Sequence, residues 1–260
     1  MDIAVSIILA ALLAIVTIKK KAFTPAAAAT ACAIMLIAGI CGSYAAMIIV
    51  IVAYGIIFAV DLVIGARSEK ITSSINLKSG ARDITQVLAN ALAATLALVI
   101  GKIFNEPAGI VVYTAALTEC LADSLASDVG VLSKKDPVDI CRMKRIKRGM
   151  SGGVSLLGTF SALVGCLVMT ALSILLFGFE IKYVIAVTVI PMVGIVIDSV
   201  LGSLVQAKYV CSVCGKHTEK KLHCSAHTRH TGGLKFINND TVNILSNFLT
   251  AALAAIYLIF

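Results

Sequence analysis

The sequence predicts an all-α fold, a polytopic bundle of about eight transmembrane helices that forms one integral-membrane domain over residues 1–260. Composition is the first reason, because 59% of the residues are apolar and only 14% are charged, whereas soluble domains carry about 25% charged residues. Mean hydropathy is correspondingly high, at +0.99. The second reason is length, because several apolar runs approach the roughly 17 to 25 residues that a helix needs to cross a bilayer.

Polar loops and short turns such as Cys41-Gly42-Ser43 divide the apolar runs. The first run has the length of a secretory signal, but its charged residues follow it instead of preceding it, so we expect a retained helix. The short second span and the polar fifth span could instead be half-helices, which would give seven or nine. The predicted spans are 3–18, 25–40, 44–64, 83–100, 108–125, a sixth from the glycine-rich stretch to residue 177, 183–205 and 240–260.

Basic residues are distributed unevenly between the two sides of this predicted bundle. The loops after the first, third, fifth and seventh spans hold 20 of the 22 Lys and Arg residues. Cytoplasmic loops carry such an excess, so we expect both termini outside and residues 206–239 as a cytoplasmic Cys/His loop. The net charge of +8 suits contact with lipid headgroups or with a polyanionic substrate. Nucleic-acid binding is not predicted, because the sequence has no basic module apart from the membrane segments.

A glycine-rich stretch, residues 147–159, joins the most basic loop to the sixth span. Lys147 and Arg148 lead into closely spaced glycines and small hydroxyl residues, at the point where a helix should begin. Free backbone N–H groups, the positive end of the helix dipole and close approach without Cβ atoms all suit a phosphate group. The stretch lacks the spacing of the Walker phosphate-binding motif. The alternative is therefore an ordinary loop before a membrane helix, in which the basic residues contact lipid headgroups.

Polar side chains form stripes at the predicted cytoplasmic ends of four spans. A single stripe would more often be a helix cap or an interhelical contact. Four stripes at one depth, level with the glycine-rich stretch, predict a polar cleft open to the cytoplasm, because such groups are costly in lipid. The stripes are Asp83, Gln86 and Asn90; Glu119, Asp123 and Ser127, with Ser124 and Asp128 beside them; Asp198, Gly202 and Gln206; and Asp240, Asn243 and Asn247.

The residue types in this predicted cleft point to phosphate chemistry. Carboxylate and amide oxygens suit Mg²⁺, which is usually held by one or two carboxylates, waters and substrate phosphates. Cations and backbone N–H groups would bind phosphates, and an apolar groove between helices would hold a lipid tail. This combination indicates phosphoryl transfer to a membrane-embedded acceptor, in which catalysis is mainly positioning and charge neutralisation.

Five motifs follow one another along the chain. They are Arg82 with Gln86-Val87-Leu88-Ala89-Asn90; Ala122-Asp123-Ser124-Leu125-Ala126-Ser127-Asp128-Val129-Gly130; Ser151-Gly152-Gly153-Val154-Ser155 with Gly158-Thr159; Asp198-Ser199-Val200-Leu201-Gly202 with Gln206; and Asn239-Asp240-Thr241-Val242-Asn243. In this order they resemble the motifs of the integral-membrane family that includes the phytyl-phosphate kinase of plant chlorophyll-phytol salvage. The resemblance covers nearly the whole chain. It implies an enzyme that phosphorylates an isoprenoid monophosphate to the diphosphate, using a nucleoside triphosphate such as CTP.

Three positions depart from the family's pattern. Asp128 stands where Glu is common, which preserves the charge and shortens its reach. Ser124 stands where Thr is usual and keeps the hydroxyl. Ser151 precedes Gly152-Gly153 without the additional Thr and Gly of the family, so the resemblance does not carry over the phosphate geometry of this loop.

Roles can now be assigned to named residues. A phosphate acceptor is largely ionised at neutral pH, so we expect no dedicated base. The predicted catalytic residues are Asp123, Asp128, Lys147, Asp198 and Asp240, of which the four acids are the expected Mg²⁺ ligands. The predicted substrate-binding and phosphate-binding residues are Arg82, Gln86, Asn90, Glu119, Ser124, Ser127, Arg148, Ser151, Gly152, Gly153, Ser155, Gly158, Thr159, Ser199, Gly202, Gln206, Asn239 and Asn243.

A second candidate site lies in the hydrophilic loop. Cys211 and Cys214 form a C-x-x-C pair, and His223-Cys224 and His227 follow it. This is metal-ligand spacing, and structural Zn²⁺ held by Cys211, Cys214, Cys224 and either His223 or His227 is chemically sensible. A reduced thiol cluster and a catalytic metal site are the alternatives.

The expected partners are membrane lipid, an isoprenoid monophosphate and a nucleotide. Other functions could use similar groups. A transporter or flippase for an anionic substrate would use the acids as a cation path, but it should show two repeated halves, and the sequence contains no convincing internal repeat. CTP-dependent nucleotidyl transfer to a phospholipid would release pyrophosphate, and a lipid-binding scaffold without catalysis is the remaining alternative.

Overall fold

The structure is a computed structural model that describes residues 3–75 and 80–260. Asp2, and Lys78 in the loop predicted after the third span, lie outside the described residues. The described chain forms seven α-helices: α1 Ile3–Lys19, α2 Pro25–Thr72, α3 Ile84–Phe104, α4 Glu106–Gly130, α5 Leu156–Phe177, α6 Ile181–Leu204 and α7 Asn239–Ile259. The predicted membrane-helix fold class is confirmed, since six of these helices are long and apolar enough to cross a membrane.

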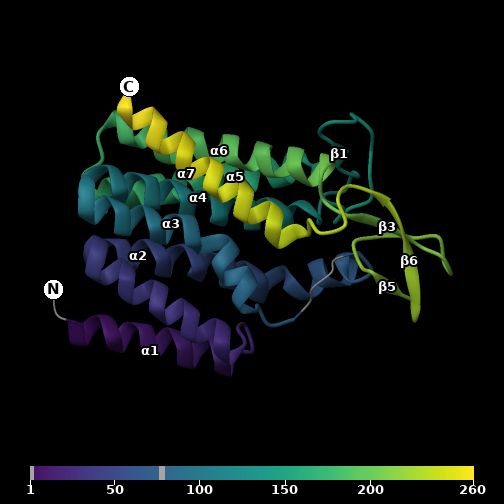
Figure 1. Ribbon diagram of the computed structural model, residues 1–260, viewed down its shortest axis with the longest axis horizontal. Coiled ribbons are helices and arrows are strands. Elements are labelled where there is room, and N and C mark those ends of the chain that lie inside the picture. The colour runs from purple at the N-terminus through teal and green to yellow at the C-terminus, as the bar shows by residue number, and fades with distance from the viewer. Residues whose placement is uncertain (1–2, 76–79) are drawn as a thin grey trace.

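Helix α2 covers both the second and the third predicted spans. It has 48 residues, which at about 1.5 Å per residue is more than twice the roughly 30 Å of a bilayer's hydrocarbon core. Ser43 interrupts it with φ 78° and ψ 179°, and the chain reverses direction there (Figure 1). The predicted turn is therefore confirmed. Gly42 suits it because a Cβ there would lie 2.9 Å from Cδ2 of Leu98. The count of eight membrane passages stays a prediction.

Local capping explains where the other helices begin. The Asp83 carboxylate accepts a hydrogen bond from the backbone of Gln86, and the Gln86 side chain accepts one from the backbone of Asp83, so the two residues form a capping box at the start of α3. The Asn105 side chain caps the start of α4 by accepting a hydrogen bond from the Ala108 N–H. Pro107 lies in the first turn of α4, where proline is well tolerated. Gly178 ends α5 in the left-handed conformation, with φ 65°, at the predicted boundary.

Helix α4 is the centre of the bundle, where it packs against α2, α3, α5, α6 and α7. Its most apolar 18-residue window has a mean hydropathy of only 1.3 but is 78% buried, whereas α6 reaches 2.4 and is 22% buried. Polar groups are costly in lipid and tolerable inside a bundle. The polarity that made the fifth predicted span ambiguous therefore marks the innermost helix.

Small residues let the neighbours of α4 approach closely. Gly101 of α3 and Gly109 of α4 face one another, and a Cβ on either would meet the backbone of the other. Such close backbone contacts are the main source of helix association in membranes, where lipid is as apolar as the side chains.

Residues 206–239, the predicted hydrophilic loop, fold into a small sheet that we call the Cys/His subdomain. Its strands are β3 Lys208–Cys211, β4 His217–Thr218, β5 Leu222–His223 and β6 Ala226–Gly232, antiparallel in the order β4-β3-β6-β5. A second pair, β1 Val138–Asp139 and β2 Gly153–Val154, joins the basic loop to the glycine-rich stretch. Both sheets lie at one end of the bundle, and the start of α1 and the end of α7 lie at the other (Figure 1). Which end faces the cytoplasm stays a prediction.

Candidate functional site

A cavity of about 950 Å³ opens among the helices at the end of the bundle that carries the sheets. Its lining comes from α1 to α7 and from the glycine-rich stretch. The structure brings most of the predicted site residues to this one cavity. They are Arg82, Gln86, Asn90, Asp123, Ser124, Ser127, Asp128, Arg148, Ser151, Gly152, Gly153, Ser155, Gly158, Thr159, Asp198, Ser199, Asn239, Asp240 and Asn243.

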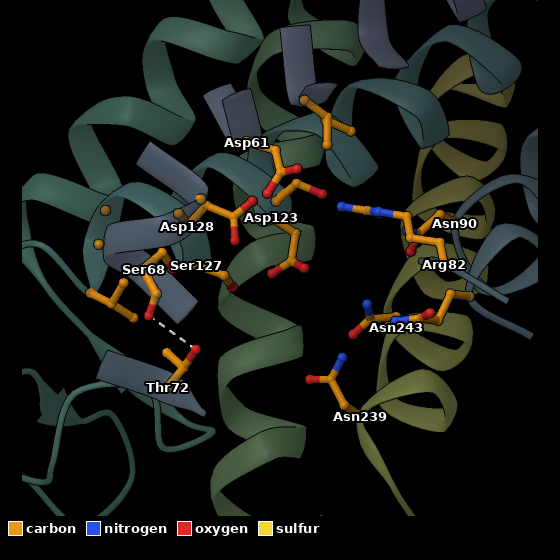
Figure 2. Close-up of a pocket in the computed structure, with 18 of the residues that line it drawn as sticks. Asp61, Ser68, Thr72, Arg82, Asn90, Asp123, Ser127, Asp128, Asn239 and Asn243 are labelled. Carbon is orange, nitrogen blue, oxygen red and sulfur yellow. Dashed lines mark hydrogen bonds between the residues drawn. The ribbon is translucent and has the colours of Figure 1, made fainter. Parts of the chain in front are cut away.

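Charge is separated across the cavity. Asp61, Asp123 and Asp128 gather on one side, and the guanidinium group of Arg82 points toward them from the other (Figure 2). Asn243 lies on the same side as Arg82. An anion bound between the two sides would meet a cation directly, and a divalent cation could screen it from the carboxylates.

The acids sit on different helices, and the fold makes them neighbours. Asp123 and Asp128 belong to α4, Asp198 belongs to α6, and the buried Asp240 lies in the first turn of α7. All four line the cavity. A set of carboxylate oxygens fits a hard cation such as Mg²⁺, so the predicted donor set agrees with that metal's chemistry. Mg²⁺ binding itself stays a prediction.

Apolar side chains of α1 and α2 also line the cavity. Leu13, Val16, Ile34, Val50 and Phe58 are among them. A cavity lined by both acids and apolar helix residues suits an amphiphile, with its headgroup at the acids and its tail among the helices.

The glycine-rich stretch forms one wall of the cavity and packs tightly against the rest of the bundle. Gly152 has φ +85°, and a Cβ there would lie 2.6 Å from the Ser203 Cα. The Ser155 hydroxyl accepts a hydrogen bond from the Gly158 N–H at 3.1 Å and caps α5. A Cβ on Gly158 would lie 2.7 Å from the carbonyl oxygen of Ala126 on α4. These glycines and Ser155 thus have structural functions in addition to the predicted phosphate contacts.

Asp139 anchors the basic loop to the end of α6. Its Oδ1 accepts hydrogen bonds from the backbone N–H groups of Cys141 and Arg142 and, at 2.7 Å, from the Ser203 hydroxyl. Burial opposes ionisation, but these hydrogen bonds outweigh it and hold the pKa of Asp139 below its ordinary value. The loop is therefore tied to the helix bundle by a charged group.

Glu219, in the Cys/His subdomain, holds the glycine-rich wall from outside. Its Oε1 accepts hydrogen bonds from the Ser151 backbone N–H at 3.2 Å and from the Ser151 hydroxyl at 2.5 Å. Its Oε2 accepts one from the Gln206 side chain at 2.8 Å. Burial raises the pKa of Glu219 above its ordinary value, and these hydrogen bonds partly oppose the rise. Gln206 thus orients this carboxylate, and its predicted contact with substrate stays a prediction.

Three further predicted residues do not line the cavity. The buried Glu119 accepts hydrogen bonds from Ser246 at 2.9 Å and from Asn247 at 2.6 Å, and the same Ser246 hydroxyl lies 3.2 Å from Oδ2 of Asp198. Gly202 packs behind the wall, where a Cβ would lie 3.0 Å from the Gly152 nitrogen. Lys147 is exposed. Direct contact of these three residues with a ligand of the cavity stays a prediction.

Three acids of the cavity were not among the predicted residues, Asp61 and Glu69 of α2 and Glu219. Asp61 carried a usable signal, because an acid within an apolar span normally faces a protein interior or an aqueous cavity. Glu219 carried no comparable signal, since it lies in a hydrophilic loop beside Lys220 and Lys221.

The second candidate site is also assembled. Cys211, Cys214, His223 and Cys224 each offer a ligand atom, and these four atoms all lie within 4.8 Å of one another. Backbone hydrogen bonds from Cys214 and Val213 are the main reason that the pKa of Cys211 falls to about 6. The structure thus selects His223, whereas His227 is not in the group.

The chain is similar to known membrane proteins. The family described as Integral membrane protein DUF92 matches residues 8–251. Protein PGR of Arabidopsis thaliana is 30% identical over 149 residues, which cover 53% of this chain and 50% of that protein. The uncharacterized membrane protein MJ0933 of Methanocaldococcus jannaschii is 28% identical over 127 residues, which cover 49% of this chain and 52% of that protein.

A third relative matches over a longer range. The uncharacterized membrane protein sll0875 of Synechocystis is 23% identical over 209 residues, which cover 79% of this chain and 71% of that protein. The chain spans about half the length of the plant and archaeal relatives. No solved structure matches it.

Proposed function

The chain belongs to the family Integral membrane protein DUF92, and from that premise we propose that it phosphorylates an isoprenoid monophosphate, such as phytyl or another prenyl phosphate, to the diphosphate. The donor is a nucleoside triphosphate, CTP or a similar nucleotide, and Mg²⁺ is the cofactor. The enzyme is a multi-pass membrane phosphotransferase whose site faces the cytoplasm, as the loop charges predict.

One observation carries the proposal. A single cavity combines an acidic side, an opposing guanidinium group and apolar lining residues from α1 and α2. A soluble nucleotide needs only the polar end, and a buried lipid needs only the apolar end. A phosphorylated isoprenoid is an acceptor that uses both, with its phosphate at the polar end.

The lining residues then take distinct tasks. Arg82 and Arg148 bind phosphate oxygens, for which the planar guanidinium is well suited. The glycines of the glycine-rich wall offer backbone N–H groups to the same anion, whereas the two donors of Ser151 are used by Glu219 and hold that wall in place. Asn90 and Asn243 orient the acceptor from the side of Arg82. Asp123, Asp128, Asp198 and Asp240 would hold Mg²⁺, which when bound neutralises charge on the phosphates.

The transfer requires no dedicated base. The second pKa of a phosphate monoester is about 6, so the acceptor is mostly a dianion at neutral pH. One of its oxygens attacks the γ-phosphorus of the nucleotide, the bond from that phosphorus to the bridging oxygen breaks, and the nucleoside diphosphate leaves with the electron pair. The contribution of the protein is to place the two anions in line and to exclude water.

The test is product analysis with the purified full chain in detergent. The reaction contains Mg²⁺, each of the nucleoside triphosphates in turn, and prenyl monophosphates of increasing length. We expect prenyl diphosphate and nucleoside diphosphate from the wild type and from Glu180→Gln, an exposed acid next to α6 at the opposite end of the bundle. Asp123→Asn should form both about 100- to 1,000-fold more slowly.

Other products would overturn the proposal. Release of pyrophosphate with a nucleotide attached to a lipid would indicate nucleotidyl transfer. Movement of prenyl phosphate across vesicles that contain the protein, without any product, would indicate a transporter.

A further inference from the structure

Four metal-ligating side chains lie together in the Cys/His subdomain, away from the groups assigned to phosphoryl transfer. Their ligand atoms all lie within 4.8 Å of one another. Cys211 ends β3, Cys214 lies in the turn before β4, and His223 and Cys224 lie at the turn between β5 and β6. Two hairpins that are neighbours in the sheet, through the pairing of β3 with β6, thus supply two ligands each.

The spacing of these atoms fits one tetrahedral ion. The Cys214 sulfur lies 3.6 Å, and the Cys224 sulfur 3.2 Å, from Nδ1 of His223. A tetrahedral Zn²⁺ with bonds of about 2.3 Å to sulfur and about 2.0 Å to nitrogen separates neighbouring ligand atoms by about 3.5 to 3.8 Å. Both sulfur–nitrogen separations are within a few tenths of an ångström of this geometry, with His223 bound through Nδ1. Ligand atoms that lie as far apart as 4.8 Å would approach by up to about 1 Å to complete it.

The backbone of the first turn supports a thiolate at Cys211. The N–H groups of Val213 and Cys214 point at its sulfur, at 3.4 and 3.5 Å, and hydrogen bonds of this kind favour the charged form. Gly215 closes the turn with φ +68°, and its N–H donates to the Cys211 carbonyl at 3.0 Å. The turn is thus shaped around that sulfur atom.

The second turn is the two-residue loop between β5 and β6, since His223 pairs with Ala226. Cys224 and Ser225 have φ of 53° and 57°, and a type I′ hairpin turn requires positive φ at both central residues. The turn thus places Cys224 directly beside His223 at the end of the hairpin.

We propose that Cys211, Cys214, His223 and Cys224 form a structural zinc site that clamps the two hairpins of the Cys/His subdomain together. Four short strands bury little apolar surface, and small folds of this kind usually need a metal or another covalent clamp. With four protein ligands the ion has no open position for substrate, so the site is structural and takes no part in phosphoryl transfer.

The site also has a mechanical link to the cavity. Strand β4 follows the turn that contains Cys214 and ends at Thr218. The next residue is Glu219, whose carboxylate accepts hydrogen bonds from Ser151 of the glycine-rich wall. The Thr218 hydroxyl donates to the carbonyl of Ile75 at 3.2 Å, and the Lys220 ammonium donates to that of Ser73 at 2.6 Å. The zinc site thereby fixes the position of the segment that supports one wall of the cavity.

Metal analysis of the purified full chain, without a polyhistidine tag, tests the assignment. We expect about one zinc per chain in the wild type, and the same in Cys141→Ser, which removes an exposed cysteine outside the group. Cys224→Ser should lose the metal. His223→Cys keeps four soft ligands and should retain it, so loss of metal in Cys224→Ser can be distinguished from general misfolding.

Cobalt replacement gives a second readout that does not depend on enzyme activity. The wild type reconstituted with Co²⁺ should show the intense visible bands and thiolate charge-transfer absorption of a tetrahedral site, and His223→Cys should shift them. Equal metal content in the wild type and Cys224→Ser, or a disulfide among these cysteines in the freshly purified protein, would overturn the proposal.

Hydrogen exchange tests the mechanical link. Removal of zinc from the wild type by a chelator should speed amide exchange at residues 217–222 and at the glycine-rich wall, while α4 stays protected. Equal exchange with and without zinc would show that the ion does not position the wall. Both outcomes are independent of whether prenyl phosphates are substrates.

Discussion

The acidic wall of the cavity, Asp61, Asp123 and Asp128, and its glycine-rich wall, residues 147–159, are built in different ways. The acidic wall stands mainly on α4, which is enclosed by five other helices. The glycine-rich wall is held by the two-residue pairing of β1 with β2 and by polar contacts such as that between Ser151 and Glu219. Neighbouring helices on several sides hold the first wall, whereas close glycine contacts and a few hydrogen bonds hold the second.

This difference determines what a substitution reports. On the acidic wall the backbone is fixed by its neighbours, so a change of side chain tests chemistry alone. On the glycine-rich wall the same residues support the fold and face the ligand, so a substitution there alters both stability and ligand binding. The predictions below either sharpen this contrast or break it.

The largest effect is expected at Asp123. Asp123→Asn removes a charge from the acidic wall while α4 stays packed, so the rate of diphosphate formation should fall about 100- to 1,000-fold, as when one preorganised electrostatic group is lost. The thermal midpoint should stay near that of the wild type. Activity within a factor of two of the wild type would remove Asp123 from the site.

Arg82 faces the acidic wall, and its replacement should have the next largest effect. Arg82→Lys keeps the charge but loses the forked geometry that binds a phosphate through two hydrogen bonds, so kcat/KM should fall about 10- to 100-fold. Arg229→Lys, an exposed arginine on β6, is the matched control. An equal loss in both variants would contradict a specific role for Arg82.

Gly158 tests the packing between the two walls. In Gly158→Ala the new methyl group would lie 2.7 Å from the carbonyl oxygen of Ala126, and overpacking of this kind costs about 1 to 3 kcal/mol. We expect a lower thermal midpoint in detergent. Gly55→Ala, where a Cβ would meet no atom within 4 Å, should not lower it. An unchanged midpoint in Gly158→Ala would show that α4 and α5 can separate freely.

Glu219 should show the smallest effect. Glu219→Gln keeps the shape of the side chain and one acceptor oxygen but weakens its hydrogen bonds to Ser151, because charged acceptors form stronger bonds by about 1 kcal/mol. We expect KM for the nucleotide to rise a few-fold with kcat nearly unchanged. A fall in kcat as large as that of Asp123→Asn would make Glu219 part of the chemistry and would end the contrast between the walls.

Much of the fold could be predicted because its causes are local. The apolar runs, the turn at Ser43 and the end of α5 at Gly178 depend on composition and on backbone preferences of a few adjacent residues. The four strands of the Cys/His subdomain were not predicted. They are two to seven residues long, too short to show an alternation that distinguishes them from a hydrophilic loop.

The candidate site was predictable in part for the same reason. Asp123 and Ser127 share one face of a helix at a spacing of four residues, so their common direction followed from helix geometry. The sequence could not predict which of Lys147 and Arg148 would face the cavity, because neighbouring residues in a loop can point in opposite directions. Of the two, only Arg148 lines the cavity.

By itself the amino-acid sequence determined that the chain is a helical membrane protein, that its acids lie near one end of their helices, and that a Cys/His cluster is present. Only the tertiary structure decided that Asp61 joins the acids, that Glu219 supports the glycine-rich wall, and that His223 completes the cluster. The reason is physical. Helical periodicity and hydropathy act between residues a few positions apart. These contacts instead depend on how segments distant in the sequence pack together, as Ser151 and Glu219 do at a separation of 68 residues, or on how two turns of a small sheet meet.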